Sequence, residues 1–170
     1  MLTTHLRLTL PKIPLLHPEQ AQSILRREVG TAITGIVEQI ATEARNRTPV
    51  GVSGLLRASI ATRVTQGSDA ASFIRGEVFT GAQAPYAVYV EEGTRAGVWR
   101  PIAPLKLWAR RVLGDERAAY RVRWAIFRRG TKGRFMFRDA LAAVRPTITP
   151  RLRAAVALAA WRYRTDHRAA

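Results

Sequence analysis

One long apolar stripe constrains the fold more than any other feature of the sequence. Between residues 19 and 47, apolar side chains recur every three or four positions, which is the period of one face of an α-helix. The stripe consists of Ala21, Ile24, Leu25, Val29, Ala32, Ile33, Ile36, Val37, Ile40, Ala41 and Ala44. Pro18 suits the first turn, and Thr48-Pro49 ends the pattern because a residue before proline is disfavoured in the helical conformation. The sequence therefore predicts a long amphipathic helix over residues 19–47.

A change of period after this helix indicates a small antiparallel sheet. Residues 60–66 and 73–80 are rich in β-branched and aromatic side chains and flank a turn-forming Gly-Ser-Asp, which predicts a hairpin. Residues 1–16 alternate between apolar and polar positions and contain two prolines, which predicts an extended N-terminal strand. Ser53 is expected to cap a single helical turn before the hairpin. For residues 84–92 two alternatives stay open, a short helix closed by a left-handed Gly93 or a strand.

The second half of the chain is predicted to be mostly helical. Helices are expected over residues 104–113, 115–129 and 135–144, and Pro146 is expected to end the third helix before a last one starts at Pro150. The apolar side chains expected to point inwards are Leu105, Trp108, Ala109, Val112, Ala118, Val122, Trp124, Ala125, Ile126, Leu152, Val156, Ala159 and Tyr163. These patterns predict an α+β fold in which a long N-terminal helix packs on a small antiparallel sheet, with additional C-terminal helices.

The length of 170 residues suits a single domain with a core that needs neither disulfides nor a structural metal. There is no Cys, and the three His are scattered, which excludes a cysteine-based zinc site or a disulfide framework. The predicted organisation begins with an N-terminal arm or strand over residues 1–18. One α+β domain follows over 19–147, with a helical insert at about 101–129, and then a C-terminal helix and tail over 148–170. No apolar run reaches the 18 or more residues that a membrane span requires, so we expect no membrane association.

Positive charge is concentrated in the second half. Residues 1–98 hold 10 basic and 8 acidic side chains, whereas residues 99–170 hold 18 and 4. Such an asymmetry points to an anionic partner, which can be nucleic acid, an anionic membrane or an acidic protein surface, although an arginine-rich coding bias competes as an explanation. On the helix expected to end at residue 129, Arg117, Arg121 and Arg128 lie within roughly 40° of one another. The predicted contact residues for DNA or an acidic partner are Arg117, Arg121, Arg128, Arg129, Lys132 and Arg134.

No catalytic constellation is present: the sequence lacks a nucleophile elbow, a paired-histidine metal motif, a phosphate-binding loop and a dinucleotide fingerprint. We therefore expect no enzymatic activity, no cofactor and no bound metal. The adjacent Glu91 and Glu92 are expected to be solvated or to pair with Arg95, and the three His to lie at the surface. The two helices over residues 104–129 have the spacing of a helix-turn-helix, but the second offers no Asn or Gln to read adenine, so arginine contact with phosphate is favoured over base readout.

The order of segments resembles the tail-component family of long-tailed bacteriophages, whose members are also described as neck, tail-completion, head–tail joining or minor tail proteins. The first matching stretch contains Pro49, Gly54, Leu55, Leu56, Arg57, Ser59 and Ile60. The second contains Tyr86, Ala87, Tyr89, Val90, Glu91, Gly93 and Thr94, with Arg95 directly after it. Residues 130–141 are similar to the family's closing segment, so the resemblance covers about residues 19–144. Shorter members pass almost directly from Thr94 to that segment, which leaves residues 101–129 as an insert.

The resemblance implies a structural virion protein without catalytic activity, made in the host cytoplasm and located in the neck or tail of the particle. It implies a homo-oligomeric ring, expected to be a hexamer, at the head-proximal end of the tail, which completes or terminates the tail and joins it to the head. The expected partners are a head-side connector or closure protein, the tail tube or terminator protein, and genomic DNA passing through the lumen. The motif residues expected to hold the fold are Gly54, Leu56, Arg57, Tyr86, Tyr89, Glu91, Gly93, Thr94 and Arg95. The alternative is a basic nucleic-acid-binding module that uses residues 104–129.

Overall fold

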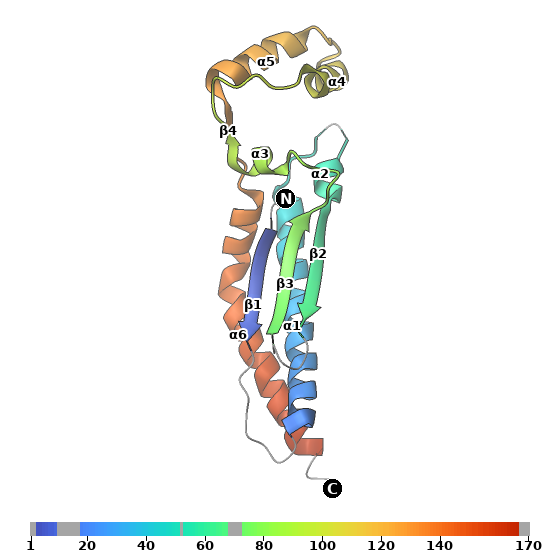
Figure 1. Cartoon of the computed structure of the whole chain (residues 1–170), viewed down its shortest axis with the longest axis vertical. Helices are drawn as coiled ribbons and strands as arrows, with labels where there is room; N and C mark the ends of the chain where they lie inside the picture. The colour runs from blue at the N-terminus through green and yellow to red at the C-terminus, as the bar shows by residue number, and fades with distance from the viewer. Residues whose placement is uncertain (1–2, 10–17, 52, 68–72, 167–170) are drawn as a thin grey trace.

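Two long helices run side by side along most of the elongated molecule (Figure 1). Helix α1 spans Pro18–Arg47 and helix α6 spans Met136–Asp166. The structure is a computed structural model that describes residues 3–9, 18–51, 53–67 and 73–166. The predicted stripe of α1 is inside: its residues from Val29 to Ala44 contact the sheet on one side and α6 on the other. The long amphipathic helix is therefore confirmed.

A three-stranded antiparallel sheet covers α1. Strands β1 (Thr3–Thr9), β2 (Ile60–Gln66) and β3 (Phe73–Thr80) are arranged in the order β1-β3-β2. The central strand alternates between buried and half-buried residues, as expected for a strand with one face on a core. Gly76 occupies a buried position because a Cβ there would come within 2.5 Å of Val37 and 2.8 Å of Ile33 on α1. The predicted hairpin and α+β fold are thus confirmed, and the N-terminal strand is confirmed within Thr3–Thr9.

The prediction that Pro146 ends a helix is wrong. One continuous helix passes through both Pro146 and Pro150. A proline removes one backbone donor and normally breaks a helix, but here both rings lie at exposed positions while Val144 and Ala155 are buried against α1. Tertiary packing therefore outweighs the local preference. The Thr147 hydroxyl also donates to the Val144 carbonyl at 2.9 Å, inside the turn that Pro146 interrupts.

Two further expectations for α6 need correction. Val156 is exposed rather than inward-facing. The helical pattern of the sequence predicts that Arg162 points outwards together with Arg151, Arg153 and Arg164. In the structure, Arg162 reaches across to α1 and donates to Glu28 at 2.8 Å. Glu28 is buried, so this contact and the one from Arg27 at 3.0 Å supply the partners that a buried carboxylate requires.

Helices α4 (Ile102–Leu113) and α5 (Ala118–Arg129) form a separate unit at one end of the molecule, which we call the arm (Figure 1). Its core is small and consists of Ala109, Ala118 and Ala119, with Ile102, Leu105 and Trp108 packed around them. Two packed helices bury only the faces between them, so three residues of the arm that the sequence predicts to be buried are exposed. These corrections concern Val112, Trp124 and Ala125.

Short elements connect the arm to the body. Helix α2 (Leu55–Ala58) begins after Gly54, which has a φ of 64° and is the N-cap in place of Ser53. The Ser53 hydroxyl nevertheless accepts a 3.4 Å bond from the Leu55 amide. Residues 87–92 form helix α3 (Ala87–Glu92), which decides between the two open alternatives. Strands β4 (Gly93–Thr94) and β5 (Thr131–Lys132) form a second, two-stranded sheet that the sequence did not indicate.

Candidate functional site

The β4–β5 pair joins two segments that lie nearly forty residues apart in the sequence. Gly93 is opposite Lys132 and Thr94 is opposite Thr131, and the two threonine hydroxyls lie 3.0 Å apart. The predicted motif residues around Gly93 and the segment starting at Gly130 therefore meet at one place. We call this place, made of residues 91–95 and 130–137, the junction.

Glycines permit the close backbone approach at the junction. A Cβ on Gly93 would overlap with the Thr131 carbonyl oxygen, and one on Gly130 would overlap with the Thr94 carbonyl oxygen. Both residues also have positive φ, 81° and 68°, which L side chains rarely adopt. Gly93 is not in the predicted left-handed helical conformation, however, because its ψ of −168° leaves the chain extended and allows β4 to form.

Glu91 caps the start of α6 from the middle of the chain. It is only 6% exposed, and its carboxylate accepts hydrogen bonds from the backbone amides of Phe137 at 3.1 Å and Arg138 at 3.0 Å. These donors are among the amides that a helix leaves unpaired at its N-terminus, where a negative charge is also favourable. The expectation that Glu91 is solvated or paired with Arg95 is therefore wrong. Sequence reasoning missed the role because the carboxylate and the amides are more than forty residues apart.

Two adjoining hollows lie beside the junction and share Pro49 and Val90. The larger, of about 670 Å³, is also lined by Tyr89 and by residues 131–134, and the smaller, of about 100 Å³, by residues 53–56 and Tyr86. Leu56 is buried beneath this surface, whereas Leu55, Tyr86 and Tyr89 are exposed. The predicted basic residues Lys132 and Arg134 belong to the wall of the larger hollow rather than to the arm. The side chains of Arg57 and Arg95 are exposed and make no hydrogen bond or ion pair with other residues that the structure describes.

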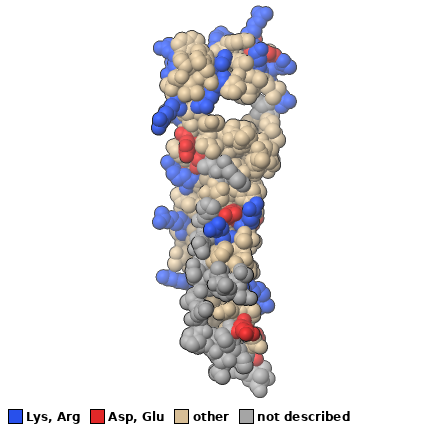
Figure 2. Space-filling model, in the orientation of Figure 1, with Lys and Arg blue, Asp and Glu red and all other residues tan. Residues whose placement is uncertain are grey.

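The arm carries the predicted arginine row. Arg117, Arg121 and Arg128 are exposed on the outer face of α5, and Arg129 is exposed near its end. Figure 2 shows Lys and Arg side chains around the arm at the top of the molecule. Residues 102–129 contain eight basic and two acidic side chains, so the arm is strongly cationic as a unit.

Aromatic rings hold several of these cations in place. The Arg128 guanidinium carbon lies 5.0 Å from the ring centre of Trp124, and the Lys106 ammonium lies 5.5 Å from that of Tyr120. Glu116, at the turn between the helices, accepts from Arg110, and this hydrogen bond holds the pKa of the Glu116 carboxyl below its usual value. The hydrogen bond to Tyr120 and then that to Glu116 raise the pKa of Lys106.

A second aromatic cluster ties the arm to the chain below it. Trp99 stacks on Phe127 with ring centres 4.3 Å apart, and the Arg123 guanidinium lies over Trp99 at 4.7 Å. Arg123 Nε donates to the Arg100 carbonyl at 2.8 Å, and the Arg100 guanidinium lies over Tyr89 at 4.7 Å. This chain of contacts connects α5 with α3.

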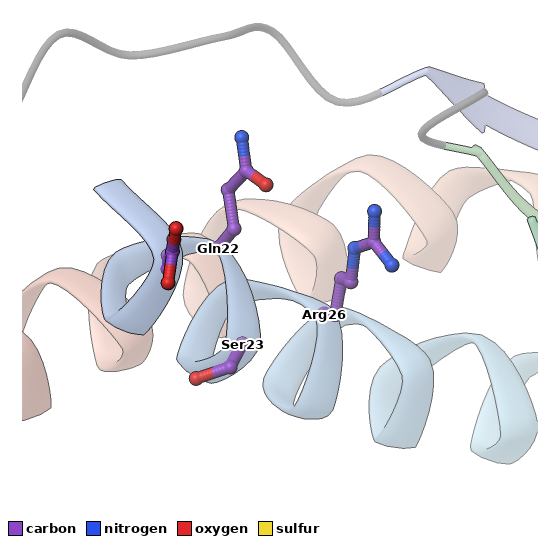
Figure 3. Close-up of a pocket in the computed structure, with 4 residues that line it drawn as sticks. Gln22, Ser23 and Arg26 are labelled. Carbon is purple, nitrogen blue, oxygen red and sulfur yellow. The ribbon is translucent and has the colours of Figure 1, made fainter. Parts of the chain in front are cut away.

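A further hollow lies far from these residues, near the start of α1. It has a volume of about 480 Å³ and is lined by Glu19, Gln22, Ser23 and Arg26. Figure 3 shows Gln22 and Arg26 pointing away from one side of α1, whereas Ser23 points to the other and donates to the Gln20 carbonyl at 2.8 Å. These side chains do not converge on a common point, so the hollow does not form a catalytic set.

The described residues hold no group of three or more His, Asp or Glu close enough to bind a metal ion, and none of their helices has the length and apolarity to cross a membrane. His17 and His167 lie outside the described residues, and so does the side chain of His5.

A comparison with known protein families gives a match that covers α1, the β2–β3 hairpin and α3. Residues 19–93 match the sequence model of the family described as "Bacteriophage HK97-gp10, putative tail-component". The match ends at Gly93, so the arm, β5 and α6 lie outside it, and the resemblance noted for residues 130–141 is not covered. No curated protein and no solved structure gives a significant match. Over residues 19–93, which include α1, the β2–β3 hairpin and α3, the chain is therefore similar to the HK97 gp10-like family of bacteriophage tail components.

Proposed function

We propose that this protein is a bacteriophage tail component that forms a ring at the head-proximal end of the tail, where it completes or terminates the tail and joins it to the head. The observation that carries the proposal is the family match over residues 19–93. The family is typically structural, and we propose no catalytic role, no cofactor and no metal. The molecule is elongated, with the cationic arm at one end and the two-helix body behind it, a shape that suits a subunit reaching between two layers of an assembly.

Strand edges offer a way to close the ring. β1 and β2 are the outer strands, and within the described residues neither outer edge is paired with another strand. Unpaired edges are ready templates for pairing with another chain, and a ring requires two different complementary surfaces on each subunit. The hollows beside the junction, with exposed Leu55, Tyr86 and Tyr89, provide a second apolar contact surface. We expect six copies, in keeping with the family.

The proposed partners are a head-side connector or closure protein and the tail tube or terminator protein. The six predicted contact residues then form two surfaces: Arg117, Arg121, Arg128 and Arg129 on the arm, and Lys132 and Arg134 at the junction. Both surfaces would face DNA in the lumen or an acidic ring of a neighbouring protein.

Deleting the gene from its phage and imaging the lysate by electron microscopy tests this function. Filled heads beside separate tails would support a joining role, and tails of abnormal length would support a terminator role. Infectious particles of normal yield would overturn the proposal. Complementation with the double variant Arg121→Glu/Arg128→Glu, compared with Arg145→Glu/Arg151→Glu on α6, then tests whether the arm contributes.

A nucleic-acid-binding module remains the second candidate because of the arrangement of the arm. In Figure 1, α4 is seen nearly end-on while α5 lies across the view, so the helices cross rather than run antiparallel. Helix-turn-helix pairs cross in a similar way. Tighter binding to one duplex sequence than to random duplexes, measured at two salt concentrations, would favour this module over a structural role.

A further inference from the structure

We infer that the outer face of α5 binds the phosphate backbone of duplex DNA without sequence preference. The inference rests on the proposed function for its biological setting, and it names the partner of the arm. The face is formed by Arg117, Tyr120, Arg121, Trp124 and Arg128, all of which are exposed.

The spacing of the arginines suits a regular polyanion. Arg121 lies four positions after Arg117 and Arg128 seven positions after Arg121, which at the helical rise places them about 6 Å and about 10 Å apart along the axis. Duplex DNA carries one charge per about 1.7 Å of its axis, so a row of this length faces several phosphates at once. Guanidinium groups can bind phosphate through two parallel hydrogen bonds.

The arginines are available for an external ligand. The side chains of Arg117 and Arg121 make no hydrogen bond or ion pair with other described residues. The bonds of Arg117 are made by its backbone, whose amide donates to the Asp115 carboxylate at 2.8 Å and whose carbonyl accepts from the Tyr120 amide at 3.2 Å. Arg128 rests on the ring of Trp124, 5.0 Å away, and Lys106 rests on that of Tyr120. A side chain that is already held in place loses less conformational entropy on binding. Trp124 therefore acts as a positioning residue for Arg128.

The composition of the face favours DNA over an acidic protein. Arg, Tyr and Trp are enriched at protein interfaces as well, but three of the five side chains here are cations, and both rings already carry cations, so the face matches a uniform polyanion. The face contains no carboxylate that would repel phosphate. Residues 95–134 contain no Asn or Gln, which are the side chains that read adenine, so we expect contact with the backbone rather than with base edges.

The test uses the full chain and measures binding to a labelled random-sequence duplex by fluorescence anisotropy over a series of salt concentrations. Polyglutamate of equal total charge serves as the alternative ligand. The arm variant is Arg117→Gln/Arg121→Gln/Arg128→Gln, and the control is Arg145→Gln/Arg151→Gln/Arg153→Gln, which removes the same charge from exposed positions on α6. Circular dichroism checks that both variants are folded.

We expect the arm variant to reduce the slope of log affinity against log salt by about 2.7, as loss of three phosphate contacts predicts, and the control to leave it nearly unchanged. Trp124→Ala should weaken DNA binding several-fold without removing a charge. An equal loss of affinity in both triple variants would overturn the inference, because binding would then depend on net charge alone. Stronger binding to polyglutamate than to DNA would overturn it in favour of an acidic protein partner.

These outcomes are separate from those of the gene deletion. If the arm variant retains wild-type DNA binding while the deletion still yields unjoined heads and tails, the inference fails and the proposed function stands. If DNA binding follows the arm arginines but deletion leaves infectious particles, the proposed function fails while the binding surface is supported.

Discussion

The body and the arm use the same helical patterning but bury different amounts of apolar surface. In the body, the sheet covers α1 on one side and α6 covers it on the other. Branched side chains of α1 such as Ile33, Ile36 and Ile40 are therefore almost fully buried. In the arm, α4 and α5 cover only each other, and the buried residues are three alanines. Burial of a large apolar side chain contributes about 1.5–3 kcal/mol, so most of the folding free energy belongs to the body. The comparison teaches that the arm is shaped for its exposed surface rather than for its core.

The largest expected effect tests the core of the body. Ile36→Ala should lower the free energy of unfolding by about 3–4 kcal/mol, because it removes buried methylene groups and leaves a cavity. Leu105→Ala in the arm should cost about 1 kcal/mol or less, since the side chain is only half-buried. Urea unfolding followed by circular dichroism measures both. Equal losses would contradict the view that the two regions differ in packing.

A glycine at the junction tests the close backbone approach between β4 and the start of β5. Gly130→Ala should cost about 3 kcal/mol, because the residue has positive φ and the new Cβ would overlap with the Thr94 carbonyl oxygen. Gly35→Ala in α1, where no atom lies within 4 Å of the new Cβ, serves as the control. It should stabilise the protein slightly, by up to about 1 kcal/mol. Urea unfolding again gives the values, and a neutral Gly130→Ala would exclude the close approach.

The cap on α6 is the next smaller test. Glu91→Gln should lower the free energy of unfolding by about 1–2 kcal/mol, since the amide supplies one acceptor and no charge to the helix N-terminus. Glu92→Gln changes the neighbouring, exposed carboxylate in the same way and should have little effect. Equal thermal unfolding midpoints for the two variants would show that Glu91 does not cap the helix.

The contact between Trp99 and Phe127 tests the attachment of the arm. Trp99→Ala should change global stability by less than about 1 kcal/mol, because the ring is half-exposed, yet it should speed amide hydrogen exchange across residues 102–129. Trp161→Ala, which removes an exposed ring from α6, is the matched control and should leave exchange in the arm unchanged. Uniformly faster exchange in α1 and α6 would show that arm and body open together.

The smallest expected effect concerns Glu116. Because its folded-state pKa lies below the unfolded value, its contribution is present above the unfolded pKa and is lost as pH falls through the folded pKa. Hydrogen exchange in the arm, corrected for intrinsic rates, should therefore increase at acidic pH below about 4.5. The variant Glu116→Gln should remove this pH dependence while leaving exchange in the body unchanged. A pH response that persists in the variant would assign it to other groups.

Periodic, local features were predictable from the sequence. The stripe on α1 and the alternation in β2 and β3 identified these elements and the α+β fold because each pattern is repeated over many residues. The same holds for the arginines of α5, whose common face follows from helical geometry alone. Their contact with DNA or an acidic partner remains a prediction.

Non-local features were not predictable. The β4–β5 pair is only two residues long on each side, too short for a pattern, and Glu91 caps a helix that begins more than forty residues later. Pro146 and Pro150 are local signals for a break, and only the packing of α6 along α1 overrides them. The sequence predicts a buried Trp124 because an aromatic ring on a helix usually packs against another element. In the arm no further element of the described residues covers that face of α5, so the ring is exposed.

The continuous course of α6 has a mechanical consequence. Its 31 residues form a rod about 46 Å long that starts at the junction, where Glu91 holds its first turn, and runs to the far end of α1. A load along the rod axis would be resisted by both helices, because α1 packs along α6 and supports it laterally. The molecule thus combines a stiff two-helix axis with the arm at one end of it (Figure 1).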